Sequence, residues 1–164
     1  MEVARTAAAA TGLEAELVAL YPALVRRLTM VLRDPIEAED VAQAAFARAF
    51  EQQRRFDGGD LRAWFYTIGL RLAFNELRRR ERRRTTRANG DDANPEWAMA
   101  TDPDLWDALA GLEAQQRAAL LLSVLEGYTH AEIGRMLGVP AGTVSSWLSR
   151  TKDRLRAVLG DTER

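Results

Sequence analysis

Residues 129–148, THAEIGRMLGVPAGTVSSWL, decide what the C-terminal part of this chain is. Thr129 with Glu132 three positions later is a capping-box pattern, which predicts the start of a short helix. Gly138 suits the left-handed conformation that ends a helix, and a tight turn of three residues begins there. A second helix is predicted from residue 141 to about residue 159. Two helices joined by such a turn form a helix-turn-helix unit.

The second helix of this unit carries side chains that suit DNA. Apolar packing positions of the unit are expected at Ala131, Ile133, Leu137, Val139, Val144 and Leu148. In DNA-binding units the second helix enters the major groove, where base edges present donors and acceptors. Its short hydrogen-bonding side chains are Thr143, Ser145, Ser146 and Ser149. Its cations, which can reach phosphates, are Arg150, Lys152, Arg154 and Arg156. The alternative is an ordinary helical hairpin with a solvated basic face.

Upstream, the segment 85–103 interrupts the helical spacing and is predicted to be a flexible linker. It contains Gly90, Pro95 and Pro103 among small polar residues. Seven acidic residues and no basic residue lie between positions 91 and 113. On both sides of the linker, apolar residues recur at helical spacing. The chain is therefore predicted to be all-α, with a disordered tail at 1–12 and two small helical domains at 13–84 and 104–160.

Three helices are expected in the first domain. Leucines recur every three or four residues in the first helix, where Pro22 predicts a kink or a break. Asp34-Pro35 is typical of a helix start, and this second helix is expected to run to about residue 54. Gly58-Gly59 breaks the chain, and Asp60 can cap a third helix that begins at the next residue.

The C-terminal end of that third helix is strongly basic. Between positions 71 and 87 there are eight arginines and two glutamates, a net charge of +6. Arginines this close repel one another, so a polyanion is favoured over a solvated helix end as their counter-charge. The aromatic residues just upstream are Phe56, Trp64, Phe65, Tyr66 and Phe74. Bases of single-stranded DNA stack on such rings, but helical spacing equally suits a hydrophobic core.

Residue types argue against an enzyme. The 164 residues include no cysteine, which excludes disulfides and thiolate zinc sites. His130 is the single histidine and is expected at the surface rather than in a metal site or a catalytic triad. The acids Glu37, Glu39 and Asp40 suit a helix N-terminus better than a carboxylate site. We expect no catalytic residue, metal or cofactor. Without a long apolar stretch we also expect no membrane insertion. The lack of cysteine fits a reducing compartment, and the expected location is the cytoplasm.

Taken in order, these segments resemble the extracytoplasmic-function sigma factors, the two-domain branch of the bacterial sigma-70 family. The resemblance covers about residues 13 to 159. Residues 38–46, AEDVAQAAF, are similar to a run in the family's region 2. That resemblance implies docking on the clamp-helix coiled coil of the RNA polymerase β′ subunit. The residues implied in this contact are Glu39, Asp40, Gln43 and Phe46.

The same resemblance implies promoter contacts in the first domain. Residues 55–59, RFDGG, and 63–68, AWFYTI, are similar to the block with which region 2 melts and binds the minus-ten strand. In the family, the loop before the tryptophan holds a flipped base. The implied minus-ten contacts are Phe56, Asp57, Gly58, Gly59, Asp60, Trp64, Tyr66, Arg71, Asn75, Arg78, Arg79 and Arg80. Arg71 departs from the family, which usually has an asparagine there that helps to open the duplex.

The second domain resembles the family's region 4, which binds the minus-35 element. The similar segments are residues 126–134, EGYTHAEIG, and 142–150, GTVSSWLSR. The implied minus-35 contacts are Thr129, Thr143, Ser145, Ser146, Trp147, Ser149, Arg150, Lys152 and Arg154. Trp147 departs from the family, which usually has an arginine there.

The function implied is that of a sigma factor. Such a protein binds core RNA polymerase, through the β′ clamp helices and the β flap, and directs initiation at promoters through their minus-35 and minus-ten elements. The resemblance further implies an anti-sigma factor as a partner. One alternative is a helix-turn-helix regulator that binds duplex DNA without polymerase. Another is a nucleic-acid-processing enzyme, for which the sequence shows no metal or nucleophile constellation.

Overall fold

The computed structural model describes the backbone of residues 2–86 and 103–160, and the side chains of residues 12–86, 107–158 and 160. Every regular element within these ranges is a helix, so the all-α prediction is confirmed. Contacts divide the chain into two parts, Met1–Ala73 and Phe74–Arg164. Of the predicted linker, residues 87–102 lie outside the described ranges. Residues 85 and 86 end one helix, and residue 103 begins the next.

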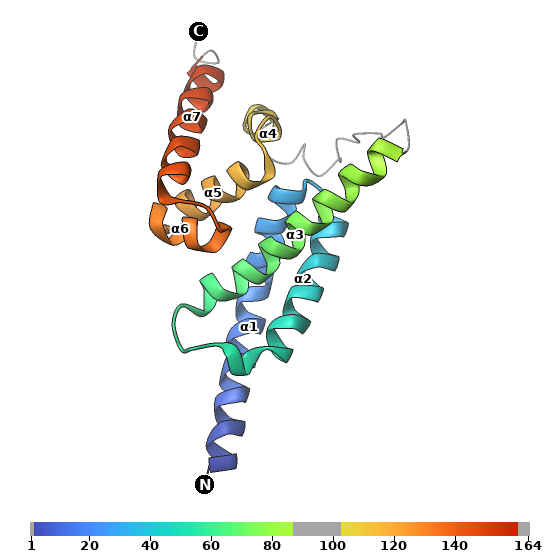
Figure 1. Cartoon of the computed structure of the whole chain (residues 1–164), viewed down its shortest axis with the longest axis vertical. Helices are drawn as coiled ribbons and strands as arrows, with labels where there is room; N and C mark the ends of the chain where they lie inside the picture. The colour runs from blue at the N-terminus through green and yellow to red at the C-terminus, as the bar shows by residue number, and fades with distance from the viewer. Residues whose placement is uncertain (1, 87–102, 161–164) are drawn as a thin grey trace. The chain divides into compact units, whose positions relative to one another are not determined.

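The N-terminal helices are α1 (Glu2–Leu32), α2 (Pro35–Glu51), the short 3-10 helix η1 (Gln53–Arg55) and α3 (Leu61–Thr86). Figure 1 shows α1 and α2 side by side and running in opposite directions. The Asp34 carboxylate accepts hydrogen bonds from the backbone N–H groups of Ile36 and Glu37 at 2.9 and 3.1 Å. These bonds cap α2 at the predicted start. The helix ends three residues before the predicted end, where η1 follows.

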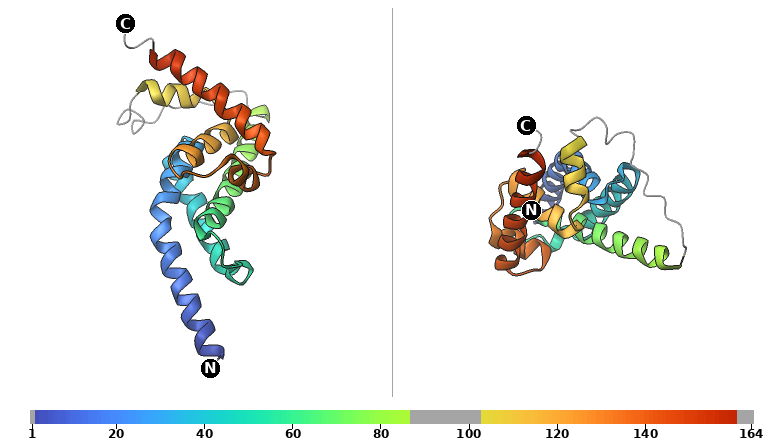
Figure 2. Two further views of the ribbon diagram at one scale, coloured as in Figure 1. Left: turned by 90° about the vertical axis from the view of Figure 1, so that its left-hand side faces the viewer. Right: turned by 90° about the horizontal axis from the view of Figure 1, so that it is seen from above.

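Helix α1 differs from its prediction in two respects. It begins at Glu2, so residues 2–12 are helical where a disordered tail is predicted, and its first turns extend past α2 (Figure 2, left). Pro22 lies inside the helix without ending it. A proline removes one backbone hydrogen bond. Leu17, Leu24 and Leu28, buried on both sides of Pro22, hold the helix against its neighbours.

Small side chains let the first three helices approach closely. Four alanines of α2 are fully buried, at positions 38, 42, 45 and 49. On α3, a Cβ atom added to Gly69 would lie 2.8 Å from a methyl carbon of Leu24 in α1. Phe65 of α3 is also fully buried. This packing orients α3, which carries the arginine-rich segment.

The C-terminal helices are α4 (Pro103–Ala110), α5 (Ala114–Val124), α6 (His130–Leu137) and α7 (Ala141–Gly160). Helix α7 contacts each of the other three. The buried apolar residues of this group are Ala108, Leu109, Leu112, Ala118, Ala119, Leu121, Leu122, Ile133, Met136 and Val144. Among the described helices of the whole chain, none is long and apolar enough to cross a membrane.

Candidate nucleic-acid interface

Helices α6 and α7 form the predicted helix-turn-helix unit, and local hydrogen bonds fix its boundaries. The Thr129 hydroxyl accepts from the backbone N–H of Glu132 at 3.2 Å, and the Glu132 carboxylate accepts from the backbone N–H of Thr129 at 2.8 Å. This is the predicted capping box. Gly138 has a φ of +71°, the left-handed conformation that ends α6.

The apolar residues that are buried in the helix-turn-helix unit are close to those predicted, with one correction. Ile133 and Val144 are fully buried, while Leu137, Val139 and Leu148 are half-buried. Ala131 is exposed, where burial is predicted. Two residues apart on a helix point to nearly opposite sides, so Ala131 cannot share the inner face with Ile133. Met136, three residues beyond Ile133, occupies that face instead.

The outer face of α7 presents most of the predicted minus-35 residues. Ser145, Ser146, Ser149, Arg150 and Lys152 are exposed, and Thr143 and Trp147 are half-buried. Arg154 forms a contact within the protein: its Nη1 donates a hydrogen bond to the backbone oxygen of Gly111 at 2.9 Å. That bond ties α7 to the residue that follows α4.

One contact on this face is not foreseen from the sequence. His130, the first residue of α6, lies with its Nδ1 atom 2.6 Å from the hydroxyl oxygen of Ser145 in α7. Both side chains are exposed, as expected for His130. The two residues are 15 positions apart, so no local spacing rule could have paired them.

The loop before α3 uses its acidic side chains to hold its own shape. The Asp57 carboxylate accepts from the backbone N–H of Gly59 at 3.0 Å, and the Asp60 carboxylate accepts from the backbone N–H of Ala63 at 3.0 Å. Gly58 has a φ of +86°, which favours glycine. Asp60 therefore caps α3 as predicted. The carboxylates of this loop shape it, and a Cβ atom added to Gly58 would meet no atom within 4 Å apart from those of its chain neighbours.

Four aromatic residues at or near the start of α3 form a half-buried pair and a buried pair, and Phe74, farther along the helix, is half-buried. Phe56 and Trp64 are half-buried, with ring centroids 5.4 Å apart and planes tilted by 48°. Tyr66 is only 1% exposed and Phe65 is fully buried. The Tyr66 ring offers no surface for a base in this conformation, and the DNA contact at Tyr66 stays a prediction.

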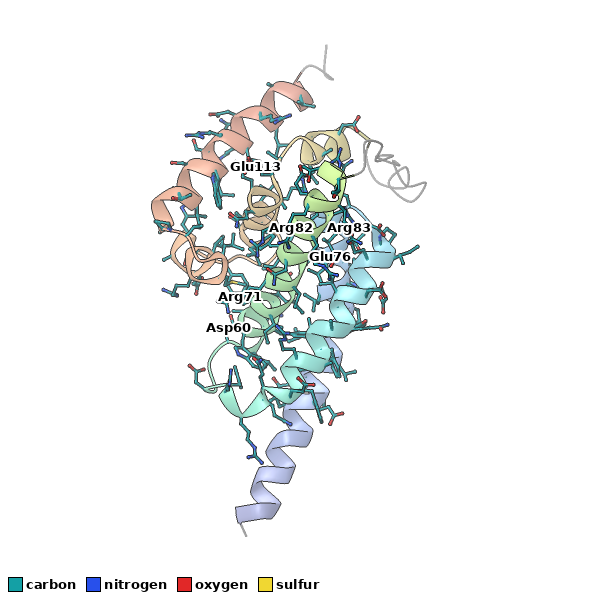
Figure 3. The ribbon with its side chains drawn as sticks, turned by 45° about the vertical axis from the view of Figure 1, so that its right-hand side comes forward. Asp60, Arg71, Glu76, Arg82, Arg83 and Glu113 are labelled. Carbon is teal, nitrogen blue, oxygen red and sulfur yellow. The ribbon has the colours of Figure 1, made fainter. Side chains whose placement is uncertain are left out.

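The arginines of α3 are partly held by their own helix. The Glu76 carboxylate accepts from Arg79 at 3.1 Å and from Arg83 at 2.9 Å. Arg78 donates to the Asn75 side-chain oxygen. Figure 3 shows Asp60 at the start of α3, Arg71 near its middle, and Glu76, Arg82 and Arg83 towards its end. The i,i+3 spacing of Glu76 and Arg79 signals such a pair in the sequence.

Among the predicted polymerase contacts on α2, Asp40 and Gln43 are exposed, while Glu39 and Phe46 are half-buried. The Tyr21 hydroxyl of α1 donates to the Glu39 carboxylate at 2.7 Å. Burial, together with this bond to a carboxylate, raises the pKa of Tyr21 to about 12.

Phe46 belongs to a three-ring cluster. Its ring meets that of Tyr21 edge to face, at a centroid distance of 6.1 Å, and that of Phe65 at 6.5 Å. Phe46 is thus held by both neighbouring helices. In the described parts of the chain, no three His, Asp or Glu side chains gather into a group that could hold a metal ion.

Comparisons with known proteins match both regions. A family model for sigma-70 region 2 matches residues 17–83, and one for sigma-70, region 4 matches residues 103–155. The ECF RNA polymerase sigma factor SigE of Mycolicibacterium smegmatis is 35% identical over 133 residues, which are 75% of this chain and 52% of SigE. The chain thus spans about half the length of that relative.

Two further relatives are covered over most of their length. The RNA polymerase sigma factor CarQ of Myxococcus xanthus is 31% identical over 83% of this chain and 82% of CarQ. The ECF RNA polymerase sigma factor SigL of Mycobacterium tuberculosis is 30% identical over 96% of each protein.

Among solved structures, a chain of the complex between the sigma factor RpoE and the anti-sigma factor NepR from Bartonella quintana matches with a TM-score of 0.74 and 26% identity. The match covers 88% of this chain and 94% of that one. With regions 2 and 4 matched in order and with relatives matched over most of their length, the chain belongs to the extracytoplasmic-function sigma factors of the sigma-70 family.

Proposed function

We propose that this protein is a sigma factor, which binds core RNA polymerase and directs initiation at promoters through their minus-35 and minus-ten elements. The proposal rests on one observation: each of the two matched regions contains a surface whose side chains are suited to DNA binding. The outer face of α7 lies within the region 4 match, and the Phe56–Trp64 pair and basic α3 lie within the region 2 match. The proposed domains are residues 13–84 and 104–160, with a linker at 85–103.

The minus-35 element would be bound by α7 in the major groove. The exposed hydroxyls of Ser145, Ser146 and Ser149 can donate to base edges or accept from them. Arg150 and Lys152 can pair with phosphates and fix the position of the helix. Trp147 presents an apolar surface that suits a thymine methyl group. Arg154 contributes by holding α7 in place.

The minus-ten strand would be bound at the start and along the length of α3. Phe56 and Trp64 offer half-exposed rings for stacking, next to the loop formed by Gly58 and Gly59. The arginines of α3, from Arg71 to Arg80 and beyond, would follow the phosphates of the opened strand. Guanidinium groups on a helix next to stacking rings suit a single strand better than a duplex.

The polymerase contact would be made by α2. Asp40 and Gln43 are exposed on this helix, and Glu39 is held in place by Tyr21. We propose that they meet the β′ clamp helices and that the second domain reaches the β flap. The polymerase then supplies the nucleotide chemistry, and this protein adds no catalytic centre or cofactor of its own. Its place of action is the cytoplasm.

An anti-sigma factor is the proposed regulatory partner. The solved relative RpoE is bound to the anti-sigma factor NepR. The exposed acidic side chains of α2 and the basic face of α7 must both be free for the proposed activity. A protein that covers either surface would keep this sigma factor inactive.

A charge reversal on α2 tests the polymerase contact. Asp40→Lys is expected to abolish binding to core polymerase, measured by co-purification. Glu51→Lys makes the same charge change at an exposed site at the end of α2 and is expected to bind as the wild type does. Equal binding by both variants would contradict the proposed contact.

The stand-alone regulator makes a different prediction. Such a protein would bind one operator duplex tightly without polymerase, typically as a dimer. The sigma factor should bind duplex DNA weakly alone, with a steep dependence on salt, and gain promoter specificity when core polymerase is added. Tight operator binding without polymerase would favour the regulator.

A further inference from the structure

The contact between His130 and Ser145 joins two parts of the helix-turn-helix unit that face solvent. The capping box at Thr129 fixes the first turn of α6 and therefore the position of His130. Ser145 is the fifth residue of α7, in the part of a recognition helix that faces base edges. At 2.6 Å, the Nδ1 atom is within hydrogen-bond distance of the hydroxyl oxygen.

This bond decides what the Ser145 hydroxyl can offer to DNA. A serine hydroxyl has one proton and two lone pairs. When Nδ1 of a neutral imidazole accepts the hydrogen bond that the hydroxyl donates, the oxygen has only its lone pairs left for DNA and can act there only as an acceptor. In the major groove, adenine and cytosine present amino donors, whereas guanine and thymine present acceptors at the corresponding edges.

Building on the proposed function, we propose that His130 is a positioning residue for promoter recognition: its Nδ1 atom accepts a hydrogen bond from the Ser145 hydroxyl, which leaves the Ser145 oxygen as an acceptor that selects adenine or cytosine in the minus-35 element. A hydroxyl without this partner rotates freely and hydrogen-bonds to either kind of base edge. His130 thus restricts Ser145 to bases that present a donor, although His130 does not contact the base itself.

A role in stability alone does not account for the arrangement. Both side chains are exposed, so water replaces the bond with little net change in free energy. The ends of α6 are already set by the capping box and by Gly138. The contact instead lies on the face of the unit that the proposed function places in the major groove.

The test uses the holoenzyme assembled from core polymerase and the intact chain, on a promoter library randomised across the minus-35 element. Sequencing of the transcribed templates gives the base preference at each position. The variants are Ser145→Ala, His130→Leu, the double variant and His130→Asn, whose side-chain oxygen is an acceptor at nearly the position of Nδ1. Ala131→Ser, at the adjoining exposed residue, is the control.

At one minus-35 position the wild type should prefer adenine or cytosine on one strand. Ser145→Ala and His130→Leu should each reduce that preference about three- to tenfold, the size of one neutral hydrogen bond. The double variant should lose no more than either single variant, because both remove the same interaction. His130→Asn should retain most of the preference, and Ala131→Ser all of it.

Two results would overturn the inference while the holoenzyme remains promoter-specific. In one, Ser145→Ala loses the preference but His130→Leu keeps it. In the other, the base selected through Ser145 is guanine or thymine, which would make the hydroxyl a donor. If the wild-type holoenzyme shows no promoter specificity at all, the proposed function itself fails, and this outcome is distinguished by the absence of specific transcripts from every variant.

Discussion

Glu76 forms ion pairs with two arginines of α3. Substitution of Glu76 by a neutral residue should strengthen the binding of this protein to single-stranded DNA. The Glu76 carboxylate engages Arg79 and Arg83 at 3.1 and 2.9 Å. Its side chain is 21% exposed, while the side chains of Arg79 and Arg83 are each 64% exposed. In Glu76→Gln the two arginines lose this ionic partner and become available to phosphates.

The magnitude follows from counterion release. Each phosphate contact with a single strand contributes about 0.7 to the slope of log affinity against log salt. Two additional contacts should steepen the slope by about 1.4, so a roughly fourfold reduction in salt concentration should raise the affinity of the variant about sevenfold more than that of the wild type. The cost in stability is small, because an exposed ion pair contributes about 0 to 1 kcal/mol.

Fluorescence anisotropy of a labelled single-stranded oligonucleotide, titrated with the intact chain over a series of salt concentrations, measures both quantities. Glu81→Gln is the matched control, because Glu81 is exposed on the same helix and forms no ion pair with another described residue. It makes the same charge change but releases no arginine. If the two variants bind with the same affinity and slope, the released arginines do not contact DNA and the reasoning is refuted.

Three further predictions concern the side-chain contacts that support these surfaces. Thr129→Ala removes the capping box and should lower the free energy of unfolding by about 1 kcal/mol, visible as a lower denaturant midpoint; an unchanged midpoint would show that the cap contributes nothing. Ile133→Ala leaves a cavity and should cost about 2 to 5 kcal/mol, whereas Val124→Ala, at a site 70% exposed, should change stability by less than about 0.5 kcal/mol in the same assay; similar values for both would contradict the assigned core. Because the pKa of Tyr21 is about 12 in the folded state against 10.0 for the free side chain, the folded state holds the phenol proton more tightly. The stability that this group contributes is therefore present below pH 10 and lost as the pH rises to about 12. Glu39→Gln should lower the Tyr21 pKa in an absorbance titration, and an unchanged pKa would exclude Glu39 as a cause.

The features that the sequence predicts best are those determined by neighbouring residues. The Asp34 cap, the Thr129–Glu132 capping box and the left-handed Gly138 each depend on hydrogen bonds between residues at most four positions apart. Their hydrogen bonds form within one helical turn, so the local amino-acid sequence is sufficient to predict these features. The order and the approximate ends of most helices follow from such signals.

The features that the sequence does not predict depend on packing between distant segments. Trp64, Phe65 and Tyr66 are consecutive and together span about half the circumference of a helix, so spacing alone does not tell which ring faces the core. Packing between separate segments decides this: Phe65 meets the Phe46 ring of α2, and both Phe65 and Tyr66 are buried. Likewise, the bond from Arg154 to Gly111 joins residues 43 positions apart.

At Pro22 only one of the two predicted outcomes is excluded. A proline within a helical pattern predicts a kink or a break, and α1 is not broken there, with leucines buried on either side of the proline. The same packing does not reach the exposed arginines and serines of the candidate site. Their roles depend on partners that are separate molecules, which is why charge and exposure, rather than packing, carry the functional proposal.

The measurement that bears most directly on the account is transcription by purified core RNA polymerase, with and without this protein, on a library of genomic promoter fragments. Sequencing the 5′ ends of the transcripts locates each start site. We expect the protein to direct initiation at a defined set of fragments that share a minus-35 and a minus-ten element. Starts that are unchanged by the protein, while it binds duplex DNA by itself, would contradict this expectation.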